Sequence, residues 1–151
     1  MTEKSQVPDE RVSVEEVVTR LFIETDRRDW GAVQACFGPS VLFDMTSIAG
    51  GRPATLSPEE ITSGWDSGLR ALDHIHHQAG NFLIDVRGGQ ATVFCYGIAI
   101  HHKKTASGRD TRMFVGSYDV TLRQQPGGGW VIDAFRFNLK FTDGNLELEK
   151  G

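Results

Sequence analysis

Two residues that lie far apart in the chain could together move a proton. Asp26 is near the end of a predicted N-terminal helix, and His77 belongs to the segment 74–81, which reads His-Ile-His-His-Gln-Ala-Gly-Asn. A carboxylate that orients an imidazole lets the imidazole accept a proton and later return it. Other interpretations stay open. Asp26 could be a surface residue paired with Arg27 or Arg28. His77 could be a buried histidine bonded to a backbone carbonyl.

His101 is a third candidate for the same site. It ends an alternating series of small residues, which would leave room beside an imidazole on one face of a strand. The series is Val93, Cys95, Gly97 and Ala99. The histidine that follows His101 would face the other side of the strand and have a structural role.

A metal site is a further interpretation of the five histidines. His74 and His76 would share a strand face and could bind zinc with His101, but no Cys or Glu completes a familiar ligand set. The sequence also has no G-x-S-x-G elbow, phosphate-binding loop or dinucleotide fingerprint. We therefore expect neither a metal nor another cofactor.

A first helix must position Asp26. It is expected to begin with Ser13 as N-cap and Glu16 completing a capping box. Apolar residues recur in it at helical spacing and form one buried stripe, with Asp26 at the edge of that stripe. The stripe consists of Val14, Val17, Val18, Leu21, Phe22 and Thr25.

Two further helices and five strands are predicted after it. Asp29 is expected to cap a short helix that Gly38 and Pro39 terminate. Ser57 is expected to cap a third helix, with Pro58 at its first position and Glu60 completing a capping box. Strands are predicted at residues 41–45, 76–86, 91–103, 112–124 and 129–141, the last four as a meander.

This order of elements predicts an α+β domain in which three N-terminal helices cover one face of a curved, mainly antiparallel sheet. We expect residues 1–11 to be a flexible leader, residues 12–141 the domain and residues 142–151 a C-terminal tail. On the last strand, Phe135 and Phe137 should point toward the helices, and Trp130 should lie on the opposite face with Arg136.

Length and charge exclude several classes of function. A chain of 151 residues has the length of a single domain. A net charge of -4 without blocks of like charge indicates no nucleic-acid partner. The longest apolar stretch, residues 93–100, is too short to cross a bilayer, and residues 1–11 contain no secretory signal. We expect a cytoplasmic protein with no membrane partner, in which Cys36 and Cys95 are buried and unpaired.

Several short motifs follow one another in an order that resembles the SnoaL-like branch of the nuclear transport factor 2-like superfamily. The motifs are Glu-Thr-Asp-Arg-Arg-Asp-Trp at 24–30, His77 with Asn81, Cys95-Tyr96 through His101, Gly116-Ser117-Tyr118 and Gly129-Trp130. The resemblance covers about residues 12–141 and implies a cone-shaped, cystatin-like fold with a mixed sheet. The pattern looks most like those of scytalone dehydratase, bile acid 7α-dehydratase and lindane dehydrochlorinase.

The resemblance also implies site residues. In those enzymes an Asp before the second short helix pairs with a His on the strand after the third helix, and Asp26 and His77 match these positions. His101 matches a further His of scytalone dehydratase. Where that enzyme has two pocket tyrosines, this chain has Thr25 and Met45, which makes phenolic naphthol substrates doubtful.

The remaining pocket residues would form an apolar wall with few hydrogen-bond donors, suited to a hydrophobic polycyclic, terpenoid or aromatic molecule. They are Phe22, Phe43, Met45, Trp65, Phe114, Phe135 and Phe137, and Tyr118 falls near a polar position of the same pocket.

These expectations point to a cofactor-independent lyase that carries out a dehydratase-like β-elimination. His77 would remove a C–H proton, Asp26 would stabilise the imidazolium, and protonated His77 or His101 would assist the leaving hydroxyl. An isomerase or polyketide cyclase with the same two residues is an alternative, as is a non-catalytic ligand-binding or assembly subunit.

We also expect a homo-oligomer, a trimer as in the dehydratases that the chain resembles or otherwise a dimer. The outer face of the sheet would still carry Phe94, Ile98 and Ile100 after the helices have covered the inner face.

Overall fold

The computed structural model describes residues 9–150. Its helices are α1 (Glu10–Arg27), α2 (Trp30–Ala35), α3 (Thr46–Ala49) and α4 (Pro58–Leu69), and the 3₁₀ turn η1 (Leu148–Lys150) ends the described chain. Its strands are β1 (Phe37–Asp44), β2 (Ala54–Leu56), β3 (His74–Arg87), β4 (Gln90–His102), β5 (Thr111–Gln124) and β6 (Trp130–Gly144). Within residues 9–150 no helix combines the length and the apolar character needed to cross a membrane.

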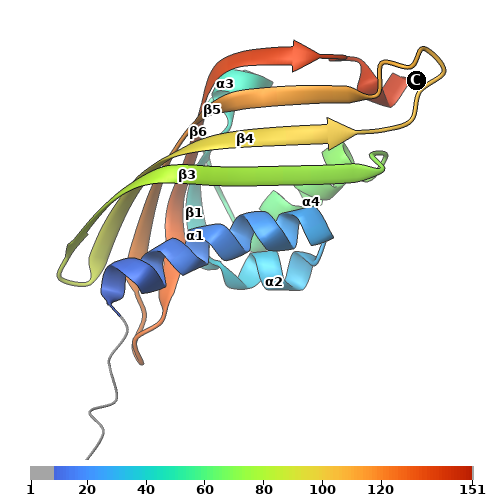
Figure 1. Ribbon diagram of the computed structural model, residues 1–151. Helices are drawn as coiled ribbons and strands as arrows, with labels where there is room; N and C mark the ends of the chain where they lie inside the picture. Colours follow the sequence, from blue (N-terminus) through green and yellow to red (C-terminus); the bar gives the residue numbers. More distant parts are fainter. Residues whose placement is uncertain (1–8, 151) are drawn as a thin grey trace, which may run out of the picture.

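The six strands form one sheet in the order β2-β1-β6-β5-β4-β3. Strands β1 and β6 are parallel, and the other neighbours are antiparallel. The sheet curves around α1, with α2 and α4 beside that helix (Figure 1). The predicted α+β class with a mixed, mainly antiparallel sheet is confirmed.

Segment 45–56 is where the predicted element order differs from the structure. It contains α3 and β2, neither of which was predicted, and its turn includes Gly50 and Gly51, both with positive φ. Elements of three and four residues are too short to show a hydrophobic period, so only the pairing of β2 with β1 and the contacts of α3 with β6 reveal them.

Helix α1 begins earlier than predicted. Asp9 is its N-cap and accepts a hydrogen bond from the Arg11 backbone N–H at 2.9 Å. The assignment of Ser13 as N-cap is wrong, because its own N–H already donates to the Asp9 carbonyl at 3.1 Å. No helix breaker separates the two possible caps, so the helix extends to the earlier one. It thus takes in residues 10 and 11 of the expected leader, and residues 1–8 lie outside the described residues.

The other two predicted caps are confirmed. Asp29 accepts from the Ala32 N–H at 3.1 Å, and Ser57 and Glu60 form a complete capping box. Gly38 and Pro39 do not terminate α2, because the helix ends at Ala35 and both residues lie in β1. Pairing of Phe37 with β6 draws the chain into the sheet before them.

A β-bulge near the start of β6 decides which side chains face the helices. Thr121 pairs with Ala134 but Leu122 pairs with Ile132, so Asp133 is an extra residue on β6. Trp130 is therefore in the same core cluster as Phe135 and Phe137, with only 6% of its surface exposed. The predicted orientation of Trp130 is wrong, and that of the two phenylalanines is confirmed.

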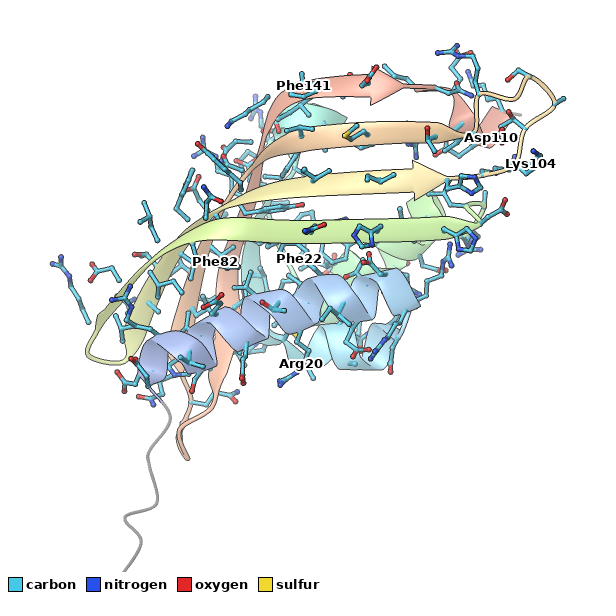
Figure 2. The ribbon with its side chains drawn as sticks, in the orientation of Figure 1. Arg20, Phe22, Phe82, Lys104, Asp110 and Phe141 are labelled. Atoms are coloured by element: carbon cyan, nitrogen blue, oxygen red, sulfur yellow. The ribbon has the colours of Figure 1, made fainter. Side chains whose placement is uncertain are left out.

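The inner face of the sheet and α1 together enclose the core. The predicted stripe of α1 is buried along its full length. Phe22 of this stripe lies between α1 and the sheet (Figure 2). On β3, a bulge around Asn81, which has a positive φ of 57°, bends the strand over the helix. The helix and this bent strand bring the C-terminal end of α1 and the first half of β3 together.

Candidate active site

A cavity of about 240 Å³ lies between α1, α4 and the inner face of the sheet. Its walls are largely apolar. Nine of the predicted site residues line it: Phe22, Met45, Trp65, His77, His101, Phe114, Tyr118, Phe135 and Phe137. Lining residues that were not predicted for the site include Thr25, Ile48, Leu69 and Arg112.

Asp26 and His77 make a two-point contact at one end of this cavity. Oδ1 of Asp26 is 2.7 Å from Nδ1 of His77, and Oδ2 accepts the His77 backbone N–H at 2.9 Å. Their side chains are 19% and 15% exposed. Both carboxylate oxygens are thus engaged by one residue, and the other ring nitrogen of His77, Nε2, is left available on a ring that lines the cavity.

The neighbouring arginines do not compete for Asp26. Arg27 binds Glu24 at 3.1 Å on the surface of α1. Arg28 ends the helix in the left-handed conformation and donates from Nη2 to the carbonyls of Leu69 and Leu72, at 3.2 and 2.6 Å. The alternative in which Asp26 is a surface acid paired with either arginine is therefore wrong.

The aromatic ring of Phe22 packs against the face of the His77 ring. The ring of Phe22 is stacked on it with an interplanar angle of 13° and a centroid distance of 5.8 Å, and Phe22 in turn contacts Tyr118. Tyr118 lies over Gly97, where any Cβ atom would overlap its ring. Burial raises the pKa of Tyr118 far above its usual range, so its hydroxyl stays protonated.

His101 has a different environment from His77, although their rings are only 6.4 Å apart. Its Nδ1 accepts a hydrogen bond from Nε of Arg112 at 3.0 Å. Burial, followed by electrostatic interactions with Arg112 and then His77, lowers the pKa of His101 to about 4. His101 is thus a neutral imidazole at neutral pH.

Arg112 and Glu149 are functional candidates that the sequence analysis missed. Arg112 forms a two-pronged ion pair with Glu149, including an Nη1–Oε2 bond of 2.8 Å. Hydrogen bonding from Arg112 lowers the pKa of the Glu149 carboxyl. Alternation along β5 places Arg112 on the same face as Phe114 and Tyr118, and this signal could have identified it. Nothing in the sequence pattern pointed to Glu149.

Phe43 does not line the cavity, unlike the other predicted wall residues. It pairs with Phe135 across the parallel β1–β6 contact and stacks on that ring at 5.8 Å. Phe43 therefore packs beside the wall, against Phe135 and Trp65, because β1 lies next to β6 toward the edge of the sheet.

The histidines considered for zinc do not come together. His74 and His76 are exposed, whereas His101 is buried and pairs with Ile75 on the other face of β3. Among residues 9–150 there is no cluster of three or more histidine, cysteine or acidic side chains that could hold a metal ion.

The two cysteines are buried, as predicted. Burial raises the pKa of Cys36 to about 11 and that of Cys95 to about 12. Neither thiol therefore forms the thiolate that a nucleophilic cysteine needs at neutral pH.

Solved structures share this arrangement of helices and sheet. Protein Kfla4162 from Kribbella flavida is 18% identical, with a TM-score of 0.86 over 93% of this chain and 97% of its own. A protein provisionally assigned as a scytalone dehydratase from Novosphingobium aromaticivorans is 17% identical, with a TM-score of 0.77 over 90% and 87%. Hexachlorocyclohexane dehydrochlorinase LinA-type3 from Novosphingobium barchaimii is 11% identical, with a TM-score of 0.74 over 91% of each chain.

At these identities the structural matches show a common fold. No curated protein matches the chain significantly. The sequence profile of the SnoaL-like domain matches residues 7–136, which is most of the chain. The resemblance to SnoaL-like proteins is confirmed by this match. The chain therefore belongs to the SnoaL-like domain family.

Proposed function

We propose that this protein is a cofactor-independent lyase that eliminates water from a small hydrophobic cyclic or polycyclic substrate. One observation carries the proposal: Asp26 holds His77 at 2.7 Å on the wall of an apolar cavity. Two of the structural neighbours carry names of enzymes that catalyse eliminations, a dehydratase and a dehydrochlorinase.

His77 acts as the base in this proposal. With Nδ1 bound to Asp26, its Nε2 takes a proton from a substrate carbon, and the electron pair of the broken C–H bond forms the new double bond as the C–O bond breaks. The imidazolium, stabilised by the Asp26 carboxylate, returns its proton to the departing hydroxyl, which leaves as water. A base positioned in this way contributes about 10²- to 10⁴-fold to the rate.

The cavity walls support an apolar substrate. Phe22, Phe114, Phe135 and Phe137 contribute aromatic surface, and His77, His101 and Tyr118 are among its few polar side chains. A cavity with many apolar contacts and few polar groups binds a hydrophobic ring system and fixes its orientation through a small number of hydrogen bonds.

Incubation with a panel of hydroxylated cyclic and polycyclic compounds in D₂O, followed by mass spectrometry, tests the proposal. The expected product has lost one water. A product that has lost no water but carries deuterium on a carbon atom would instead identify an isomerase or cyclase, because both begin with the same proton abstraction. Binding of panel members without any turnover would contradict the enzyme proposal and favour a ligand-binding subunit.

The outer face of the sheet leads to a prediction about assembly. Ile98, Val115 and Phe141 form a cross-strand row there, with Ile98 and Phe141 exposed, and Phe94 and Ile100 are partly buried on the same face. Phe141 lies on the side of the sheet away from α1 (Figure 2). We propose that copies of this chain associate through this row, as a trimer or otherwise as a dimer.

Light scattering on the purified protein at micromolar concentration should give the mass of an oligomer. Ile98→Glu should lower it to the mass of one chain, because the new carboxylate would be desolvated in the interface. Ile23→Glu is the matched control, since Ile23 is a similarly exposed residue on α1, and the oligomer should persist in that variant. A monomeric wild-type protein would contradict the proposal.

A further inference from the structure

We infer that the C-terminal turn η1 is part of the machinery of the site: Glu149 holds Arg112, and Arg112 holds His101 in the tautomer that presents an N–H to the cavity. Arg112 and Glu149 are then positioning residues, and His101 is a hydrogen-bond donor to an oxygen of the bound molecule. This inference deepens the proposed function and rests on it for its catalytic meaning.

The direction of the Arg112–His101 hydrogen bond fixes the tautomer. Nε of a guanidinium can only donate, so Nδ1 of His101 must accept at their separation of 3.0 Å. A neutral imidazole that accepts at Nδ1 carries its proton on Nε2. No oxygen of the described residues accepts a hydrogen bond from Nε2 of His101, whose ring lines the cavity. This N–H can therefore donate a hydrogen bond to a molecule bound in the cavity.

Arg112 is held so that its Nε can make this contact. Its side chain is only 11% exposed, and both terminal nitrogens bind the Glu149 carboxylate. Two parallel hydrogen bonds fix the plane of a guanidinium, which a single ion pair does not. The orientation of the third nitrogen toward His101 follows from that plane.

The C-terminal turn is itself anchored, so Glu149 has a defined position. Leu148 is fully buried in a cluster with Leu72 and Ile75, which flank the start of β3. The Asn145 N–H donates to the Thr111 carbonyl at 2.8 Å, one residue before Arg112. The turn thus joins the end of β6 to the end of the cavity where His101 lies.

Burial is the main reason that His101 stays neutral. Burial, then Arg112 on β5 and His77 on β3, lower its pKa, whereas Glu149 on η1 and Asp26 on α1 raise it, and the result is a pKa of about 4. His101 therefore does not carry the proton to a leaving hydroxyl at neutral pH, as the sequence analysis allowed. His77 moves the proton, and His101 stabilises negative charge that develops on an oxygen of the substrate.

Nitrogen-15 NMR of the full-length protein, labelled at histidine, tests the tautomer without any substrate. His101→Gln identifies the His101 signals. We expect the wild-type signals to show a proton on Nε2 alone, unchanged until the pH approaches about 4. A His101 that carries its proton on Nδ1, or on both nitrogens at neutral pH, would overturn the inference.

Two variants test whether Arg112 and Glu149 set the tautomer. Arg112→Met should produce a mixture of tautomers and raise the pH at which His101 becomes protonated. Glu149→Gln should produce a smaller shift in the tautomer ratio and slightly lower that pH, because it removes a carboxylate that raises the pKa of His101. If Arg112→Met does not fold, Glu149→Gln provides the test. Arg87→Met removes an exposed arginine paired with Asp85 and should leave the His101 signals unchanged. Unchanged signals in the folded Arg112 and Glu149 variants would refute the role.

These measurements separate the inference from the proposed lyase activity. The tautomer can be present in a protein that catalyses no elimination, and an elimination can occur with His101 in the other tautomer. Where turnover is measured, His101→Ala should reduce kcat by about 10²-fold, as loss of one donor to a developing oxyanion does. Arg112→Met should reduce kcat in proportion to the fraction of His101 that has left the Nε2–H form.

Discussion

Asp26→Asn should leave the fold intact and reduce the rate of the proposed elimination by about 10³- to 10⁴-fold. The carboxylate now accepts two hydrogen bonds from His77, one from the backbone N–H and one from the ring. An amide has only one oxygen, so its NH₂ group would face one of these two donors. If the NH₂ faces Nδ1, the ring must carry its proton on Nε2 and cannot act as a base at the cavity. Steady-state kinetics with the substrate found in the panel, together with circular dichroism, measure the effect.

Two comparisons make this result specific to the pair. His77→Gln should lose at least as much activity, and the double variant should be little worse than either single variant, because residues that act as one unit are not additive. Glu24→Gln removes an acid from the same helix that binds Arg27 outside the cavity, and it should retain wild-type activity. An Asp26→Asn enzyme within a few-fold of wild type, or losses that multiply in the double variant, would show that the two residues do not work as a base and its partner.

The stability of the protein should fall as the pH falls, and His101 should account for roughly 2 to 3 kcal/mol of the loss between about pH 7.5 and about pH 4.5. The pKa of His101 is lowered from 6.5 to about 4 in the folded protein, chiefly by burial. Between pH 6.5 and about pH 4, the imidazole of His101 therefore binds a proton in the unfolded chain but not in the folded chain. The stabilising contribution is complete above the unfolded pKa and is lost as the pH falls toward the folded one.

Urea denaturation of the wild type and of His101→Gln at the two pH values measures this contribution. The variant has no group that titrates at this position, so its free energy of unfolding should depend less on pH by that amount. Phe114→Leu alters the same cavity without changing a titratable group, and should shift stability equally at both pH values. Equal pH dependence in wild type and His101→Gln would mean that His101 is not held neutral by its surroundings.

Features that depend on neighbours in the sequence were predictable. The apolar stripe of α1, the Asp29 cap and the Ser57–Glu60 capping box arise from residues within a few positions of one another. The alternation along β3 likewise places Ile75 and His77 on one face. The Asp26–His77 contact could be predicted because a helix-edge position and a strand face, both local properties, coincide with the positions that pair in the enzymes that the chain resembles.

Features that depend on pairing between distant segments were decided only in three dimensions. The pairing of β5 with β6 leaves Asp133 as an extra residue in a bulge, and this bulge reversed the predicted face of Trp130. The position of β1 next to β6, toward the edge of the sheet, put Phe43 beside the cavity wall rather than on it. Glu149 reaches Arg112 across 37 residues because the C-terminal turn is buried against β3. The hydrophobic period of a segment predicts which way its side chains point relative to that segment alone. Bulges, strand order and long-range ion pairs depend on contacts with distant segments, which the period does not describe.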